Sequence, residues 1–250
     1  MKALLVCNGP LDGAAVARLR AEATAADLVV GVDGGAVHLI AHGIVPDVVT
    51  GDFDSLDAET LAGLEARGVR VVPTPDQEFN DLDKALAYAL REREAGSVRV
   101  HGATGGRLDH VYSALSTLLK YAAADVRLVD GVGETWALAA RREATLHGDD
   151  LPGRVLSLMA LGRVTGVHTT GVRWPLHGEE LAPGHRDGTL NVITEPTVTI
   201  SVEEGDLLVM LHHGDDGSPP SAFGTLTPRR SFLAPPPSLA SERGGEGDTE

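Results

Sequence analysis

Short apolar runs alternate with helical segments over the first 130 residues, and this alternation limits the possible folds more than any other feature of the chain. The runs are rich in Val and Leu and lack polar residues at every second position, which is typical of parallel strands covered on both faces. They are Ala3–Cys7, Leu28–Val32, Val48–Thr50, Val69–Val72, Val98–Val100 and Val126–Val129. The pattern predicts an α/β domain over residues 1–130, built on an open, doubly wound, mostly parallel sheet.

Helical periodicity is clearest in two of the segments between these runs. Apolar residues recur every three or four positions from Asp81 to Ala95 and again from Leu108 to Ala123, so each segment predicts an amphipathic helix. Asn80 directly precedes the first segment, where its side chain is suited to cap the helix.

The sequence pattern changes after residue 130, where helical periodicity fades and short β-prone runs are separated by Gly, Pro and Asp. The runs are Thr135–Ala139, Val155–Ala160, Thr165–His168, Val198–Val202 and Leu207–Leu211. They predict an antiparallel β-sandwich or small barrel over residues 131–214. Residues 215–250 are rich in Pro, Ser and Gly with few periodic apolar residues, so we expect a disordered tail there.

Charge and composition exclude several classes of protein. The net charge is −15 and no basic stripe or block occurs, so nucleic-acid binding is not expected. An acidic protein can still bind nucleotides when divalent cations bridge carboxylates to phosphates. No apolar run is long enough to cross a membrane, and no signal peptide is expected because the apolar part of the N-terminus is too short. Cys7, the single cysteine, is expected to be a small buried hydrophobe and fits the reducing cytoplasm.

Four loops rich in chemically useful side chains follow predicted strands of the α/β half. They cover residues 32–36, 46–55, 74–84 and 102–110. In open α/β sheets ligands bind outside the carboxyl ends of the strands, so we expect these loops to converge. Asp52 and Asp54 lie two residues apart, and alternate side chains of extended backbone share a face, so both could bind one Mg²⁺. The alternative is that Asp54 or Ser55 caps the following helix.

The last two loops carry candidate phosphate-binding groups. Gly105 and Gly106 free backbone amides beside a helix N-terminus, and Arg107 supplies a planar donor fork. Asp109 could cap the helix, pair with Arg107 or hold a metal, and the glycines could equally form a plain turn. Asp81 and Lys84 are one helical turn apart, which also fits a simple surface pair. Trp136 and Trp174 fit either a core or a pocket.

In this order, the loops resemble the signature of thiamine pyrophosphokinases. That family shows an Asp-Gly-Gly loop, then Gly-Asp-Phe-Asp-Ser, then Asp-Gln…Thr-Asp…Lys, then Gly-Gly-Arg-x-Asp-His. A later Thr-Thr-Gly-x-x-Trp/Tyr segment corresponds to residues 169–174 here. The resemblance spans roughly residues 30–211, and residues 46–55 and 102–110 are its most specific parts.

The resemblance implies an N-terminal α/β domain, a C-terminal antiparallel β-sandwich and a homodimer with its active sites at the subunit interface. It also implies ATP and thiamine as substrates, with Mg²⁺. The implied catalytic residues are Asp52, Asp54, Asp81, Arg107 and Asp109, of which Asp52, Asp54 and Asp81 would bind the metal. The implied nucleotide-binding residues are Asp33, Gly34, Gln77, Lys84, Gly105 and Gly106. Trp174, contributed by the partner subunit, would stack on thiamine, and Asn191 would also bind it.

Two residues depart from the family pattern. Asn80 replaces the usual Thr before Asp81 and keeps a polar cap, whereas Leu190 replaces a Ser of the thiamine pocket and removes a hydroxyl. The implied reaction is attack of the thiamine hydroxyl on the β-phosphorus of ATP, with Asp81 or Asp109 accepting the proton. Because of Leu190, another hydroxymethyl acceptor such as a pterin is one alternative. A non-catalytic nucleotide-sensing module is the other.

Overall fold

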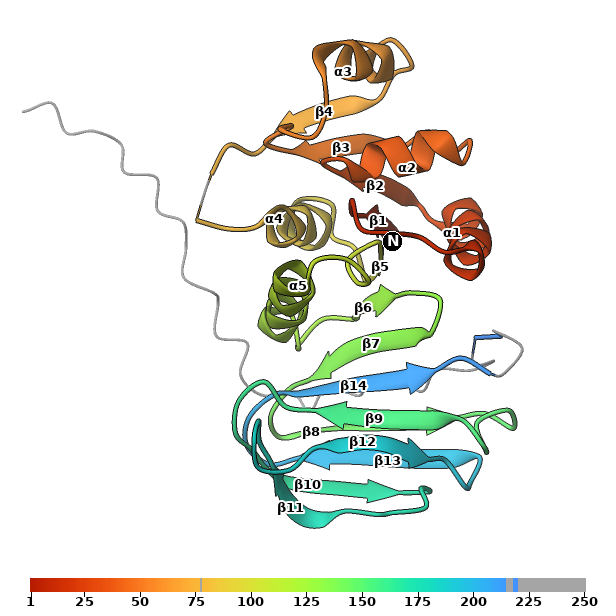
Figure 1. Cartoon of the computed structure of the whole chain (residues 1–250), viewed down its shortest axis with the longest axis vertical. Helices are drawn as coiled ribbons and strands as arrows, with labels where there is room; N and C mark the ends of the chain where they lie inside the picture. Colours follow the sequence, from red (N-terminus) through yellow and green to blue (C-terminus); the bar gives the residue numbers. More distant parts are fainter. Residues whose placement is uncertain (77, 215–217, 220–250) are drawn as a thin grey trace, which may run out of the picture.

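The structure is a computed structural model that describes residues 1–76, 78–214 and 218–219. Its strands form a sheet of ten and a sheet of four, and the larger sheet runs along much of the long axis of the molecule (Figure 1). Gln77 and nearly all of the expected tail lie outside the described residues. Among the described residues, no helix is long and apolar enough to cross a membrane.

Six parallel strands form one end of the large sheet, in the order β4-β3-β2-β1-β5-β6. They are β1 (Lys2–Val6), β2 (Leu28–Val32), β3 (Val48–Gly51), β4 (Arg70–Pro73), β5 (Ser97–His101) and β6 (Val126–Val129). Each predicted run therefore became a strand, with ends that differ by two residues at most. The strand order reverses at β1, between β2 and β5, so loops from both sides meet there.

Helices cover both faces of this parallel part. They are α1 (Gly13–Ala25), α2 (Gly35–Ala41), α3 (Ala58–Glu65), α4 (Asp81–Ala87) and α5 (Leu108–Lys120). Leu5 packs in the core under α4 and α5, whereas its neighbour Leu4 packs with Leu19 of α1 and Leu39 of α2. This alternation of one strand between two cores confirms the doubly wound α/β fold.

The predicted helices are both shorter than expected. Asn80 caps α4 as predicted, since its side chain accepts a hydrogen bond from the Asp83 amide at 2.8 Å. The helix then turns into a π-helical segment, η1 (Tyr88–Glu92), and ends before Ala95 because Glu94 adopts a left-handed conformation with φ 54°. The other helix, α5, ends at Lys120 rather than Ala123.

The antiparallel half continues the same large sheet. Strand β7 pairs antiparallel with β6, and β14, β9 and β12 follow it to the edge. The second sheet has the order β11-β10-β13-β8. Together these strands are β7 (Gly133–Leu138), β8 (Arg142–His147), β9 (Val155–Met159), β10 (Val164–Thr170), β11 (His177–Leu181), β12 (Gly188–Val192), β13 (Thr197–Val202) and β14 (Leu207–His212).

A separate apolar core between the two sheets confirms the sandwich. Trp136 and Val209 of the large sheet lie in this core with Val167 and Ile200 of the small one, all almost fully buried. Three strands (β8, β11 and β12) were not predicted, because their sequences are polar and they lie at sheet edges. The expected domain boundary at residue 130 falls between β6 and β7, inside the continuous sheet, and stays a prediction.

Candidate active site

Three aspartates gather beyond the carboxyl ends of β2 and β3. One carboxylate oxygen from each of Asp33, Asp52 and Asp54 lies within 4.8 Å of the others. The backbone brings them together, because Asp33 adopts φ 46° and its amide donates a 2.8 Å hydrogen bond to Thr50 at the end of β3. Phe53, between the other two aspartates, also has a left-handed conformation with φ 64°. Such conformations of non-glycine residues, one in each of the two loops, cluster at functional sites.

Two members of the aspartate cluster have local hydrogen-bond donors, and the buried one does not. The Asp54 amide donates to Asp52 Oδ1 at 3.2 Å, and Ser55 Oγ donates to Asp54 Oδ1 at 3.0 Å. Asp33 is only 7% exposed, and its Oδ1 has no hydrogen-bond partner within the described chain. A buried carboxylate oxygen without a donor is costly unless a cation or other ligand completes it. Asp54 does not cap α3, since that role falls to Asp57, which accepts from the Thr60 amide at 2.7 Å. The donor set of three carboxylates therefore fits a hard divalent cation.

Asp81 lies outside this group of three but close to it. Its carboxylate accepts from Lys84 Nζ at 3.1 Å, and Lys84 also donates to the Thr74 carbonyl at 2.9 Å. Burial raises the pKa of Asp81, Lys84 lowers it, and the charges of Asp52 and Asp33 raise it again, with a net increase. The pair is half-buried at the edge of the aspartate cluster, so it is more than a surface pair.

The glycine loop after β5 (residues 102–107) is hydrogen-bonded to the chain on one side and exposed to solvent at its glycines. Thr104 Oγ1 donates to Asp130 at 2.9 Å, while Gly105 (φ 78°) and Gly106 are exposed. Glycine is the residue that adopts such a φ without strain. Arg107 and Asp109 pair with each other through bonds of 2.6 and 3.1 Å on the exposed first turn of α5, which confirms that they interact. The hydrogen bond from Arg107 lowers the pKa of Asp109.

A further loop at this edge was missed in the sequence. Residues 8–10 follow β1, the central strand at which the strand order reverses. A Cβ on Gly34 would collide with the Asn8 amide, and a Cβ on Gly9 would collide with the Gly102 carbonyl. The loops after β1, β2 and β5 are therefore in direct contact, and Gly34 allows that close packing. The rule that predicted the other loops applies equally to this one.

Cys7 directly follows β1 and packs against the apolar core. It is half-buried, and burial followed by the charge of Asp81 raises the pKa of its thiol to about 12. A thiol with so high a pKa is a poor nucleophile.

Trp174 marks a second candidate region, in the β-sandwich. Its side chain is 57% exposed on the loop between β10 and β11, whereas Trp136 is buried in the core. Asn191 fixes the Trp174 backbone from both sides, accepting from its amide at 3.1 Å and donating to its carbonyl at 2.7 Å. Thr169 holds the other end of the loop through a 2.9 Å bond from the Leu176 amide. Asn191 therefore positions Trp174.

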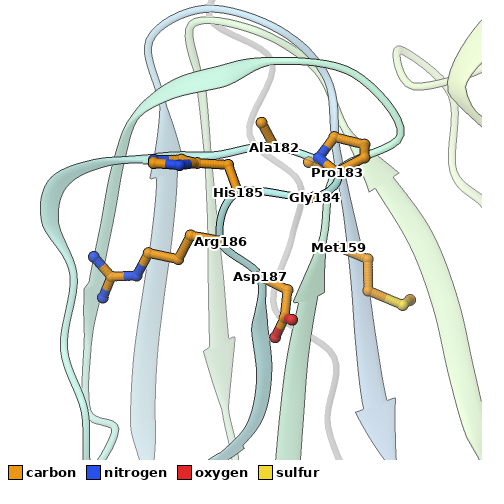
Figure 2. A pocket seen from close by; sticks show the side chains of 8 residues that line it. Met159, Ala182, Pro183, Gly184, His185, Arg186 and Asp187 are labelled. Atoms are coloured by element: carbon orange, nitrogen blue, oxygen red, sulfur yellow. The ribbon is translucent and has the colours of Figure 1, made fainter.

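A small pocket of about 190 Å³ opens beside Trp174. Its lining residues are Leu158, Trp174, Pro175, Leu176, Arg186, Asp187, Gly188, Thr189 and Asn191. A neighbouring hollow of about 250 Å³ shares Arg186 and Asp187 with it and lies under the turn from β11 to β12 (Figure 2). Leu190 lines neither pocket. It has φ 59° and is 66% exposed. Replacing the family's Ser by Leu190 therefore removes no hydroxyl from the lining of either pocket.

The two candidate regions lie far apart in one chain. Asp52 follows β3, near one edge of the ten-stranded sheet, and Asn191 belongs to β12 at the other edge. Eight strand positions separate β3 from β12, which at about 4.8 Å each is roughly 38 Å along the sheet. Figure 1 shows the same separation, with β3 and β10 toward opposite ends of the long axis.

Comparison with known proteins supports the division of the chain into these two regions. Residues 19–129 match the model of the thiamin pyrophosphokinase catalytic domain, and residues 143–207 match that of the thiamin pyrophosphokinase vitamin B1 binding domain. Together the two matches span well over half of the chain. The aspartate cluster and the glycine loop fall in the first match, and Trp174 falls in the second.

Individual relatives agree with the family models. Thiamine pyrophosphokinase 2 of Arabidopsis thaliana is 30% identical over 174 residues, which cover 65% of this chain and 64% of the relative's own length. Thiamine pyrophosphokinase of Bacillus subtilis is 27% identical over 74% of this chain and 87% of its own. The crystal structure of the Geobacillus thermodenitrificans thiamin pyrophosphokinase has a TM-score of 0.71 at 28% identity, covering 86% of this chain and 99% of that one. The chain belongs to the thiamine pyrophosphokinase family.

Proposed function

We propose that the protein transfers the diphosphate of ATP to the hydroxyl of thiamine, giving thiamine diphosphate and AMP. One observation carries the proposal: three carboxylates converge at the edge of an α/β sheet, and one of them is buried with an unpartnered oxygen. Family membership supplies the substrates, since relatives are named for this activity.

Mg²⁺ fits the aspartate cluster better than any other place in the described chain. Asp33, Asp52 and Asp54 would hold it, with Asp81 close enough to bind through water or substrate. When bound, the ion would neutralise the charge on the phosphates of ATP and on the transferring group. This set differs from the one implied by resemblance, because Asp33 joins Asp52 and Asp54 more closely than Asp81 does.

The other residues of this edge would bind and orient ATP. Gly105, Gly106 and the guanidinium of Arg107 are exposed and suit phosphate oxygens. The Gly34 turn and the glycine loop both pack against the loop after β1, at Asn8 and Pro10 respectively. Transfers of this type depend mainly on positioning and charge stabilisation. Asp81 is the better candidate for accepting the hydroxyl proton, because burial raises its pKa whereas the hydrogen bond from Arg107 lowers the pKa of Asp109.

Each active site would be completed by a second copy of the chain. Reacting atoms must approach to about 3 to 3.5 Å, and one chain separates Asp52 from Asn191 by roughly ten times that distance. A homodimer in which Trp174 of one subunit faces the aspartate cluster of the other removes the difficulty. The exposed apolar residues on both regions, Leu108 and Tyr112 of α5 and Trp174 and Leu190 of the sandwich, support such a contact.

The reaction is tested by measuring AMP formation from ATP and Mg²⁺ with thiamine, with a hydroxymethyl pterin and with no acceptor. We expect AMP only with thiamine, in a one-to-one ratio to thiamine diphosphate. AMP formed only with the pterin would assign a different acceptor. ATP binding without AMP from any acceptor would indicate a nucleotide-sensing module.

The shared site is tested by mixing two impaired variants, Asp52→Asn and Trp174→Ala, at low thiamine. If each site combines Asp52 of one chain with Trp174 of the other, random mixing restores about a quarter of the wild-type sites. If each site lies within one chain, the mixture shows only the average of the two variants. Light scattering on the wild type should show a dimer.

A further inference from the structure

The pocket beside Trp174 carries an uneven set of charges. The guanidinium of Arg173 lies over the Trp174 ring, 5.5 Å from its centroid, and Arg186 lines the pocket. Arg186 has a distant partner in Glu179, at 3.9 Å. Among the described residues that line the pocket, Asp187 supplies the carboxylate. Without Asp187 the pocket would be positively charged.

Asp187 is held in place but not saturated. Its Oδ1 accepts from the amide of Thr189 at 3.1 Å and from its hydroxyl at 2.7 Å, and these bonds lower the pKa of the carboxyl. Its other oxygen has no hydrogen-bond partner in the described chain. Figure 2 shows the neighbouring hollow, which Asp187 also lines; there Asp187 lies on the Met159 side of the β11–β12 turn, while His185 and Arg186 point to the other side. The charge is thus fixed in position and available to a ligand.

The size of the pocket indicates what it can hold. About 190 Å³ is below the range of about 300–1,000 Å³ that is typical of a whole ligand site, so the pocket suits one ring of a substrate. Thiamine carries a permanent positive charge on its thiazolium ring. An exposed tryptophan face and a carboxylate both attract such a cation. A neutral acceptor would gain no binding energy from the charge of the carboxylate.

We infer that Asp187 is a specificity residue that selects a cationic acceptor at the Trp174 pocket. This inference rests on the proposed function. It adds a criterion that Trp174 alone does not supply, because an aromatic face also stacks on neutral rings such as pterins.

The test compares thiamine with its neutral thiophene analogue, 3-deazathiamine, which has the same shape without the ring charge. In Asp187→Asn we expect the KM for thiamine to rise about two- to fivefold, as for an exposed charge pair, with the KM for the analogue unchanged. The KM for ATP should stay the same. Equal losses for both compounds would show that Asp187 only shapes the pocket, and no loss for either would show that it plays no part.

Glu195→Gln is the matched control. Glu195 is exposed in the loop after β12, next to Gly171, and lies outside the pocket lining, so its variant makes the same change in net charge nearby. A similar rise in the thiamine KM in this control would attribute the effect to net charge and overturn the role of Asp187.

Binding measured without turnover separates this inference from the proposed function. Trp174 is exposed and Trp136 is buried, so quenching of tryptophan fluorescence by thiamine should report on the pocket. Wild-type protein that binds thiamine but forms no AMP would overturn the proposed reaction, and the charge-dependent loss in Asp187→Asn would still support the inference. Wild-type protein that binds the neutral analogue as tightly as thiamine would overturn the inference alone.

Discussion

The aspartate region and the Trp174 region use the backbone in different ways. In the α/β half, candidate residues lie in loops after β1, β2, β3 and β5 and in the loop that leads from β4 into α4, so the topology of a parallel sheet brings them to one edge. In the sandwich, Trp174 depends on hydrogen bonds from Asn191, beside Leu190 in a left-handed conformation and a register irregularity in β12. One region is positioned by topology and the other by individual side chains.

This difference predicts where substitutions act. In the aspartate region, neighbouring loops hold each other in place, so replacing one carboxylate should remove chemistry and leave the geometry intact. In the Trp174 region, the supporting side chain sets the geometry, so replacing it should alter thiamine binding through the position of Trp174. Substitutions in each region can therefore test whether topology positions one site and individual side chains position the other.

The largest effect is expected from Asp52→Asn. Removing one of three converging carboxylates should lower turnover about 100- to 1,000-fold, because the charge of the proposed cation site is lost. Turnover is measured as AMP formed with thiamine, and thermal unfolding checks the fold. Near-normal turnover in a folded variant would contradict the metal assignment.

Asp57→Asn provides the matched control in the same loop. Asp57 caps α3 and lies outside the aspartate cluster, and Asn caps helices about as well as Asp. Turnover should therefore be unchanged. If it fell as far as in Asp52→Asn, the loss would reflect the net charge of the loop and not the three converging carboxylates.

A smaller effect is expected from Asn191→Ala, which removes both bonds to the Trp174 backbone. The KM for thiamine should rise about fivefold, roughly the cost of one net hydrogen bond, while the KM for ATP stays constant. Asn191→Asp keeps the acceptor for the Trp174 amide and loses the donor to the Trp174 carbonyl. Its KM for thiamine should therefore lie between those of the wild type and Asn191→Ala. An equal rise in both KM values would contradict the separation of the two regions.

The same distinction explains what could be predicted from the sequence. Parallel strands read as continuous apolar runs, and loops after them share an edge, so Asp52, Asp54 and the glycine loop could be placed together. The loop at Asn8 obeys this rule and could have been included. Asp187 could not, because no general rule brings a residue of an antiparallel edge turn next to Trp174. Thiamine binding by Asn191 stays a prediction, and its hydrogen bonds to the Trp174 backbone appear only in the folded chain.

The smallest effect is expected from replacing Glu22, which tests whether a hydrogen bond at the end of β5 helps to position the glycine loop. His101, fully buried at the end of β5 just before this loop, is hydrogen-bonded through Nε2 to Glu22 of α1 at 2.8 Å. Burial raises the pKa of Glu22, but the bond from His101 and the nearby charges of His101, Arg99 and Arg18 outweigh it, and the net pKa is lowered. The carboxylate therefore stabilises the fold above its unfolded pKa, and this contribution is lost as the pH falls through the lower folded value.

Glu22→Gln should accordingly lower the unfolding free energy by about 1 kcal/mol at pH 7, since a charged hydrogen bond becomes a neutral one. The gap to the wild type should begin to narrow as the pH falls below the ordinary pKa of a glutamate, and it should close below the lowered pKa at which Glu22 of the folded protein becomes protonated. Urea unfolding of both proteins at pH 7 and at successively lower pH measures this difference in unfolding free energy. If topology alone positions the glycine loop, turnover of Glu22→Gln at pH 7 should stay within about twofold of the wild type. A large loss of turnover with an unchanged KM for thiamine would show instead that a single side chain positions this loop as well, and the contrast between the two regions would fail.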